Sequence, residues 1–339
     1  MSGELNWGLL GHDWAVNLLR QHIAHDAVRH AYLFVGPPGV GRRTLALRFA
    51  RALHCINPPA PGESCGVCRA CQQVESMQYP DLSVVQAETE GGVLKIDQVR
   101  EVNHSLSLKP YQSKNRVALF LRFQEANQNA QNALLKTLEE APSYAILILT
   151  ADNAEQLLPT IVSRCEIMRL RALPIETVES HLLNNGASAE DARLLAHVSN
   201  GRPGYALRLL NDPDALKART ERLDDLKELM SATRVRKFAY ADKLARDKDT
   251  FRRVLMLWSS FYRDAMLVIS KATPGSTPGA GSPLANIDRA DEISALAGHL
   301  TLPQARRTVN GLEKAVELLD KNINARLLAE LTLLDLPRD

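Results

Sequence analysis

The sequence predicts an α/β domain with a doubly wound parallel sheet, followed by two helical regions. Four short apolar runs, HAYLFVG, DLSVVQA, NRVALFLRF and AILILTA, alternate with helical patterns in the first half of the chain. Buried parallel strands with crossover helices give this alternation. Beyond Asp212 strand signals stop and amphipathic helical patterns take over. We therefore expect domains at residues 1–170, 171–212 and 213–339.

The two helical regions differ in the length of their helical patterns. Residues 171–212 carry short patterns punctuated by glycines, which predicts a small helical lid. In the last region apolar residues recur at helical spacing from Phe251 to Ile269. The simplest interpretation of that stripe is a buried helix face. The segment KATPGSTPGAGSPL, at 271–284, is rich in Pro, Gly and Ser and predicts a flexible loop between helices of this region.

Composition indicates an ordinary globular protein with no broad nucleic-acid footprint. The 339 residues are 45% hydrophobic and 24% charged, and the formal net charge is only +2. Such a small charge argues against a large basic surface that binds DNA directly. The N-terminal MSGELNWGLLGHDWAV lacks a basic segment followed by an apolar stretch, and no run reaches the roughly 18 apolar residues of a membrane span. We expect a cytoplasmic protein.

Four of the five cysteines fall within 17 residues and have metal-ligand spacing. Cys55 precedes Cys65-x-x-Cys68-x-x-Cys71, so four thiolates can surround one ion in a zinc module at 55–71. Four protein ligands leave no open position, which predicts a structural zinc site. A redox CxxC pair and an iron–sulfur cluster are the alternatives. Cys165 lies far away in sequence and is expected to be an ordinary buried thiol.

The stretch YLFVGPPGVGRRTLALRFA is close to a phosphate-binding loop. Such loops need glycines whose backbone wraps phosphates, a lysine that reaches the β- and γ-phosphates and a hydroxyl that holds Mg²⁺. Here Arg42 occupies the lysine position and Arg43 the hydroxyl position, with Thr44 one residue later. Weak binding of a phosphate through Arg42 or Thr44 stays open. The candidate loop residues are Gly36, Gly39, Gly41, Arg42, Arg43 and Thr44.

The acidic pair that holds Mg²⁺ in an NTPase is also missing. Counted back from the helical NALLKTLEE, its two positions fall on Leu121 and Arg122, at the end of an apolar strand. Glu125 is the nearest carboxylate, and we expect it to be a solvated residue. Both the loop and the strand therefore lack the residues that bind phosphate and Mg²⁺ in an active NTPase.

The lid has lost its expected arginine too. In SNGRPGYALRLL the position from which a lid arginine contacts a γ-phosphate falls on Gly204. Arg202 and Arg208 are nearby, and the simpler interpretation of each is a surface cation.

One element of an ATPase assembly is intact. LLPTIVSRC places Ser163 and Arg164 after a short helix that begins at Pro159. A guanidinium at such a turn can grip phosphate oxygens of a neighbouring subunit's nucleotide. By chemistry alone, an ordinary surface salt bridge explains the same arginine.

The combination of these motifs resembles a known family. GPPGVG, the Cys-x₉-Cys-x₂-Cys-x₂-Cys spacing, IDQVREV, NALLKTLEEAP and LLPTIVSRC occur in this order. The order is similar to that of the AAA+ clamp-loader subunits of bacterial DNA polymerase III, over residues 5 to about 210, and more loosely in the C-terminal NINARLLAELTLLDL. The SRC motif, the cysteines and NALLKTLEE together make the resemblance specific, whereas the glycine loop alone is weak.

The resemblance implies a place in a pentameric ring. Delta and three gamma/tau-type ATPase subunits complete that ring, which is held together by a collar of C-terminal helical domains, here 213–339. ATP binding lets it open the sliding clamp and place it on primed DNA. For a subunit with a degenerate loop, the resemblance implies a stator that hydrolyses no ATP and has no polymerase activity. Its candidate catalytic residues are Arg164, a finger in the neighbour's ATP site, and Ser163.

Two other functions compete with this interpretation. An active gamma/tau-type ATPase would need the missing lysine, hydroxyl and acidic pair. A zinc-dependent nucleic-acid binder would need aromatic and cationic residues in the zinc module, where CGVCRACQQVESMQYP offers Arg69 and a distant Tyr79. Neither alternative accounts for the SRC and NALLKTLEE motifs together.

Overall fold

The chain folds into two compact units. The computed structural model describes residues 6–89, 91–270, 284–321 and 323–337. The first unit comprises 1–174 and 201–205, and the second comprises 175–200 and 206–339. The finer boundary near residue 212 stays a prediction. Apart from Leu284, the predicted loop at 271–284 lies outside the described residues.

The first unit is built on a five-stranded parallel sheet with the strand order β2-β3-β4-β1-β5. Every neighbouring pair is parallel, and β1 pairs with β4 so that Val35 lies opposite Ala151. The doubly wound parallel sheet is therefore confirmed. The strands are β1 (Ala31–Val35), β2 (Leu82–Val85), β3 (Arg116–Phe120), β4 (Ala145–Ala151) and β5 (Glu166–Arg169).

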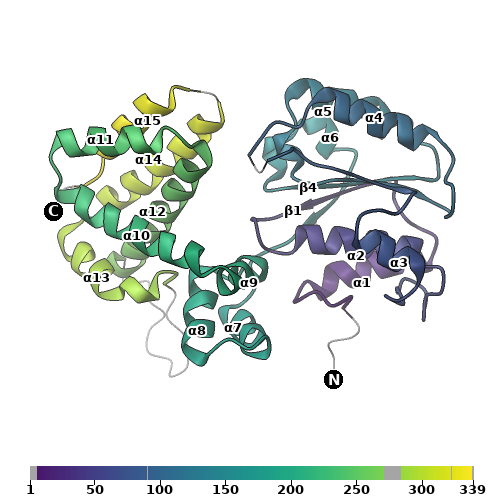
Figure 1. Cartoon of the computed structure of the whole chain (residues 1–339), viewed down its shortest axis with the longest axis horizontal. Helices are drawn as coiled ribbons and strands as arrows, with labels where there is room; N and C mark the ends of the chain where they lie inside the picture. The colour runs from purple at the N-terminus through teal and green to yellow at the C-terminus, as the bar shows by residue number, and fades with distance from the viewer. Residues whose placement is uncertain (1–5, 90, 271–283, 322, 338–339) are drawn as a thin grey trace. The chain divides into compact units, whose positions relative to one another are not determined.

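Helices cover both faces of this sheet, as Figure 1 shows. Alternate residues of β1 point to opposite faces, so Tyr32 and Phe34 pack with one layer while Leu33 and Val35 pack with the other. One layer holds α1 (Asp13–Ala24), α2 (Arg42–His54) and α3 (Arg69–Glu75), and the other holds α4 (Ile96–Ser107), α5 (Gln128–Glu139) and α6 (Pro159–Val162). Short 3₁₀ turns, η1 (Phe123–Glu125) and η2 (Ala154–Gln156), follow β3 and β4.

The sequence predicted four of the five strands, and β5 was missed. In β5 only Met168 is buried, while Glu166 and Arg169 are exposed. Its sequence EIMR has only two apolar residues between charged ones, so it lacks the apolar run that revealed the other four strands.

Every regular element of the second unit's described residues is a helix, as expected. Its 3₁₀ turn η3 (Ile287–Arg289) precedes α13. Helix α9 (Pro203–Asn211) begins in the first unit and ends in the second. The remaining helices are α7 (Ile175–Asn184), α8 (Ala189–Val198), α10 (Pro213–Ser231), α11 (Arg234–Leu244), α12 (Lys248–Ile269), α13 (Ala290–His299), α14 (Leu302–Asp320) and α15 (Ala325–Leu334).

Helix α12 lies at the centre of the second unit's core. Trp258 and Tyr262 are fully buried, and the Trp258 indole N–H donates to the Arg222 carbonyl at 2.9 Å. The apolar stripe from Phe251 to Ile269 is therefore mainly a buried helix face, and half-buried Met266 and Ile269 end it. Because the core uses this stripe, its apolar area is not available for binding another subunit.

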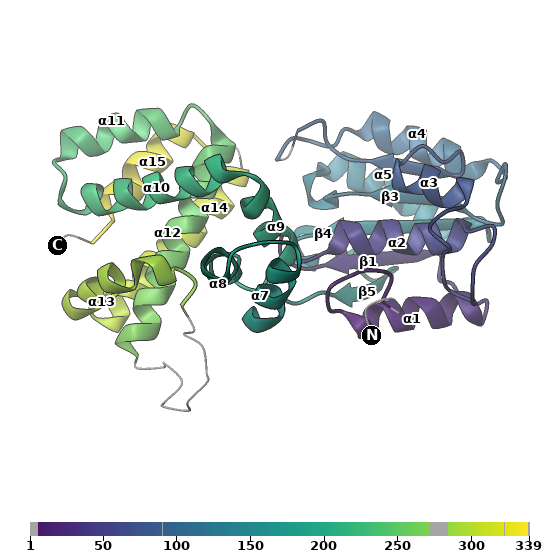
Figure 2. The same ribbon diagram turned by 60° about the horizontal axis from the view of Figure 1, so that its bottom comes forward.

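Helices α11 and α15 carry exposed apolar side chains instead. The two helices pack side by side, and Arg326 pairs with Asp242 at 2.9 Å across them (Figures 1 and 2). We name the exposed set the α11/α15 apolar residues: Val235 (79% exposed), Phe238 (38%), Leu327 (52%), Leu331 (53%) and Leu334 (39%).

Candidate functional site

The phosphate-type loop connects β1 to α2 and is covered by the start of α9. Gly39 and Gly41 have φ angles of 83° and 114°, which glycine adopts without strain. The Gly204 N–H donates to the Gly39 carbonyl at 2.8 Å. A Cβ on Gly39 would lie 2.8 Å from the backbone nitrogen of Tyr205. The loop therefore keeps its glycine-dependent shape and is packed closely against residues 204–205.

Arg42 forms a buried ion pair within the chain. Its side chain is 9% exposed, and Nη2 donates to Asp152 Oδ1 at 2.6 Å. Asp152 directly follows β4, next to the end of β1, and Gly36 N–H donates to the neighbouring Ala151 carbonyl at 3.3 Å. The arginine at the lysine position is thus held across the carboxyl ends of β1 and β4.

Arg43 and Thr44 lie on the exposed side of α2. Arg43 Nη2 donates to Met77 Sδ at 3.6 Å, and Arg43 and Thr44 are both exposed. No hydrogen bond or ion pair joins either side chain to the Arg42–Asp152 pair.

The strand end that holds Mg²⁺ in active ATPases carries no free carboxylate among the described residues. Leu121 is 3% exposed and belongs to the core. Arg122 adopts a left-handed conformation with φ of 51°, and its Nε donates to Glu125 Oε1 at 2.8 Å. The Glu125 side chain is only 8% exposed and also accepts the Gly91 N–H at 2.8 Å. The expectation that Glu125 is solvated was therefore wrong: its carboxylate is buried and accepts hydrogen bonds from Arg122 and Gly91.

The lid residues take structural positions in this chain. Gly204 contacts Gly39 as described above, and the Arg202 guanidinium lies over the Tyr205 ring at 4.7 Å from its centre. Arg208 lies further along α9. Arg202 therefore serves a cation–π contact beside the loop.

Arg164 lies at the turn between α6 and β5, with its side chain 35% exposed. Nη1 donates to the Thr160 carbonyl at 2.8 Å and Nη2 donates to Glu139 Oε1 at 2.7 Å. Ser163 Oγ also donates to the Thr160 carbonyl, at 3.2 Å. The fork is thus held at the surface by the last residue of α5 and the first turn of α6.

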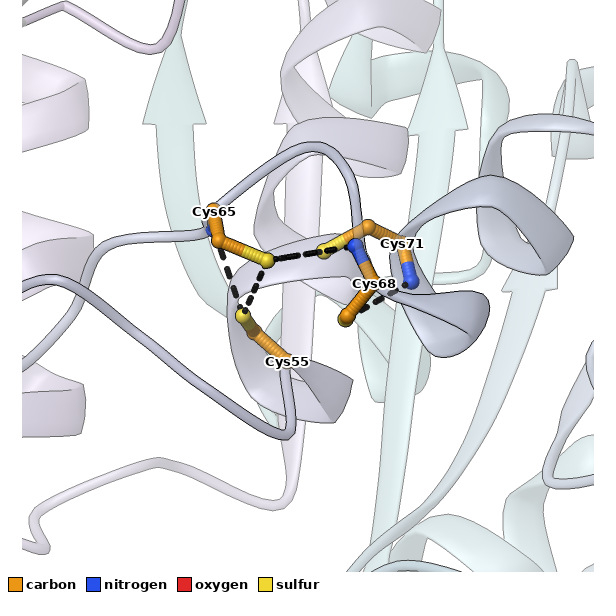
Figure 3. Close-up of side chains that lie close together, drawn as sticks. All are labelled: Cys55, Cys65, Cys68 and Cys71. Carbon is orange, nitrogen blue, oxygen red and sulfur yellow. Dashed lines mark hydrogen bonds between the residues drawn. The ribbon is translucent and has the colours of Figure 1, made fainter.

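Cys55, Cys65, Cys68 and Cys71 converge on one point, as Figure 3 shows. Cys55 is the C-cap residue that follows α2, Cys68 caps the N-terminus of α3 and Cys71 lies in its first turn. Their sulfurs lie within 4.8 Å of one another, with Cys55 and Cys65 at 3.6 Å and Cys65 and Cys71 at 3.9 Å. Thiolates bound to tetrahedral zinc at about 2.3 Å lie about 3.8 Å apart, so this group can hold such an ion.

Backbone N–H groups point at three of these sulfurs. The N–H groups of Cys65, Cys68 and Cys71 donate to the sulfurs of Cys55, Cys65 and Cys68 at 3.2, 3.3 and 3.5 Å. Burial opposes ionisation of Cys68, but the N–H of Cys71 and other donors outweigh it and lower the pKa of Cys68 to about 6. Donors of this kind favour the thiolate that a metal needs.

Cys165 lies outside this group. It is partly buried against the core, and burial raises the pKa of its thiol to about 12. It therefore fits the expected role of an ordinary packed thiol, although it is not fully buried.

Sequence reasoning missed Asp152 and Glu139, the partners of the two most important arginines. Asp152 follows an apolar strand directly, and carboxyl ends of parallel strands are where ligands bind in α/β sheets, so its position carried a signal. Glu139 lies in the NALLKTLEE motif, but nothing in its spacing pointed to Arg164.

The comparisons with known proteins agree on one family. Residues 11–174, about half of the chain, match the family described as "DNA polymerase III, delta subunit". The delta' subunit of Bacillus subtilis (strain 168) is 33% identical over 185 residues, and that of Pseudomonas aeruginosa PAO1 is 36% identical over 183 residues. These alignments cover 55% and 53% of this chain and 55% of each relative. The chain thus spans about half the length of these relatives.

Two further comparisons extend beyond the delta' proteins. The tau subunit of Escherichia coli K12 is 30% identical over 207 residues, which cover 59% of this chain and 32% of that protein. A gamma subunit-related protein from Thermotoga maritima aligns over 94% of this chain and 97% of its own, with 15% identity and a TM-score of 0.47. That score is too low to add to the sequence relationship.

The described ranges contain no helix with both the length and the apolar character needed to span a bilayer. The sequence matches cover the sheet, the degenerate loop, the four cysteines and the turn that bears Arg164. Over residues 11–174 the α/β unit matches the DNA polymerase III delta-subunit family, and it is similar to the delta' subunits of that polymerase.

Proposed function

We propose that this chain is a delta'-type stator of a DNA polymerase III clamp loader. In this proposal it works in the cytoplasm within a pentameric ring that also contains delta and gamma/tau-type subunits. The ring opens the sliding clamp and places it on primed DNA at the expense of ATP. The stator hydrolyses no ATP and places Arg164 in the ATP site of the adjacent gamma/tau-type subunit.

The exposed fork of Arg164 is the observation that carries this proposal. A guanidinium inserted from a neighbouring subunit stabilises the charge that develops on a transferred γ-phosphoryl group. Arg164 is 35% exposed at a surface turn, and exposed Glu139 and a backbone carbonyl are its partners. Exposed ion pairs contribute only about 0–1 kcal/mol, so exchanging Glu139 for phosphate oxygens costs little.

The state of the chain's own nucleotide loop supports the stator role. Arg42 is committed to Asp152, Arg122 is committed to Glu125, and Leu121 is buried in the core. No described side chain at this strand end is free to hold Mg²⁺ or orient an attacking water. An active gamma/tau-type ATPase is therefore the weaker interpretation.

We propose zinc as the metal of the four cysteines, with a purely structural role. Four thiolates complete a tetrahedral shell, so no position remains for a substrate or a water. Bound there, the ion would join the end of α2 to the start of α3 and stabilise a module with little apolar core of its own.

The helical second unit is proposed to form the collar contact. The α11/α15 apolar residues are the exposed surface that a neighbouring helical domain would bury. The apolar stripe of α12 is buried in the unit's own core, so it takes no part in this proposed contact.

The finger role is tested in a ring reconstituted from this chain and its cognate gamma/tau-type and delta subunits. Arg164→Ala should leave assembly intact and lower ATP turnover with clamp and primed DNA by about a third or more, because one of the three ATPase sites loses its finger. Arg164→Lys should repair little, since an ammonium lacks the fork. The matched control is Arg100→Ala, which removes another exposed, ion-paired arginine. Wild-type turnover by assembled Arg164→Ala rings would refute the finger role.

A further inference from the structure

The Arg42–Asp152 ion pair lies where a working phosphate loop holds its ligand. Arg42 is the first residue of α2, and Asp152 follows β4 beside the end of β1. The loop between β1 and α2 normally wraps phosphates, and its lysine reaches over them. Here the equivalent cation bends onto a carboxylate of the same chain.

The burial of Arg42 separates this contact from a surface salt bridge. The side chain is 9% exposed, whereas Asp152 is 31% exposed and remains reachable from solvent. Nη1 of Arg42 is buried and has no hydrogen-bond partner among the described residues. One guanidinium nitrogen thus donates to the carboxylate, while another lies buried without a partner.

The surrounding backbone favours an anion at this place. Gly41 caps α2 without a side-chain acceptor, so the helix begins with unsatisfied N–H groups and a partial positive charge. Meanwhile Gly204 and Tyr205 pack on Gly39 and fix the loop. A cation, a helix start and a rigid glycine loop together need a negative charge, and Asp152 supplies it.

We propose that the Asp152 carboxylate is the resident anion of this loop and keeps it closed to nucleotides. A phosphate must compete for Arg42 with a carboxylate of the same chain, whose effective concentration is high. The apparent affinity of the phosphate is therefore reduced to the small fraction of chains in which Arg42 is unpaired. Asp152 is thereby a specificity-determining residue that excludes phosphate ligands. The inference goes beyond the proposed function and does not depend on Arg164.

The experiment measures pyrophosphate binding to the isolated, zinc-loaded full chain by titration calorimetry. Asp152→Asn keeps the shape of the side chain and removes its charge. This variant should bind pyrophosphate at least about tenfold more tightly than the wild type, equivalent to about 1.4 kcal/mol. Adding Arg42→Met to Asp152→Asn should remove the gain. ADP should give the same order of affinities if the whole nucleotide enters.

A matched control separates this effect from net charge. Asp97→Asn removes one exposed carboxylate, also paired with an arginine, on α4. It should leave pyrophosphate affinity at the wild-type value. If Asp97→Asn gains as much as Asp152→Asn, the gain reflects general electrostatics and the proposal is wrong.

Two further outcomes overturn the inference. One is wild-type binding of pyrophosphate as tight as that of Asp152→Asn, because the loop would then be open. The other is a folded Asp152→Asn variant with no gain. Should that variant unfold, Asp152→Ser is measured in its place and judged by the same criteria, with circular dichroism confirming the fold.

Discussion

Arg164 donates through Nη2 to Glu139 Oε1 at 2.7 Å, so the proposed finger and the end of α5 form one exposed ion pair. This pair gives a sharp test between two roles of Arg164. If the arginine serves only as a surface salt bridge, removing either partner breaks the same interaction and has the same effect. If it serves a neighbour's ATP, only its own removal matters.

We predict that Glu139→Gln and Arg164→Ala behave differently in the reconstituted ring. Glu139→Gln should leave ATP turnover at the wild-type rate or raise it by up to about fivefold. An exposed ion pair is worth about 1 kcal/mol at most, so freeing Arg164 from Glu139 can gain no more than that. Arg164→Ala should lower turnover while the chain's thermal midpoint stays nearly unchanged. Equal losses from both substitutions would assign Arg164 to the salt bridge alone.

We predict about one zinc ion per chain, bound by the four clustered cysteines. Cys68→Ser should lose the metal and lower the thermal midpoint, because binding energy of a structural ion contributes to folding. Metal analysis and thermal unfolding measure both effects. Cys165→Ser is the control and should keep the metal. Less than about half an ion per wild-type chain, or full zinc in Cys68→Ser, would contradict the assignment.

Most of the sheet could be predicted because β1 to β4 are continuous apolar runs. Buried parallel strands need apolar side chains on both faces, and that requirement is visible in a single sequence. The edge strand β5 escaped because its sequence EIMR holds only Ile167 and Met168 between charged residues. The other edge strand, β2, has the sequence LSVV and was predicted, so the run of apolar residues decides whether a strand can be predicted, not its place in the sheet.

The ion pairs of the site could not be read from local patterns. Arg42 and Asp152 are separated by 110 residues, and only the pairing of β1 with β4 brings them together. Glu125 was expected to be solvated for a related reason. Its burial depends on the Gly91 N–H, which a distant loop supplies. The absence of the lysine, the hydroxyl and the acidic pair could be seen in the sequence. The ion pairs that Arg42 and Arg122 form instead could be seen only in the folded structure.

We predict no ATP hydrolysis by the isolated chain, and none after Arg42→Lys. The lysine would restore one phosphate contact, but Leu121 and Arg122 still leave Mg²⁺ without a carboxylate. A steady-state assay with and without Mg²⁺ measures this, and a gamma/tau-type subunit serves as the positive control. Mg²⁺-dependent turnover by the pure wild-type chain would overturn the stator role.

We predict that Leu331→Glu weakens assembly without destabilising the chain. Leu331 is 53% exposed on α15, so a charge there costs little in the free chain but would be buried unpaired in a collar. Size-exclusion chromatography with the gamma/tau-type subunit should show loss of co-elution. Met256→Glu is the control, since Met256 is an exposed apolar residue of α12 outside the α11/α15 apolar residues. Equal co-elution of Leu331→Glu and wild type would remove this surface from the collar.

We predict that the stabilising effect of Asp81 disappears in acid. The carboxylate is fully buried, and its oxygens accept the N–H groups of Tyr111, Gln112 and Ser113 at 2.7, 2.7 and 3.0 Å. Burial alone would raise its pKa, but these donors and the Ser113 hydroxyl outweigh burial and lower the pKa.

A lowered pKa in the folded state means that Asp81 stabilises the fold fully above its unfolded value of about 3.9, and that this contribution is lost as pH falls below it. Asp81→Asn should therefore cost about 1–3 kcal/mol at pH 7, because an amide cannot accept all of these hydrogen bonds. Urea unfolding of wild type and variant at pH 7 and near pH 3 measures the difference. The difference in the free energy of unfolding between wild type and Asp81→Asn should become smaller in acid, since protonated Asp81 then resembles the amide. A difference that stays constant or grows would show that the charge of Asp81 does not hold the segment between α4 and β3.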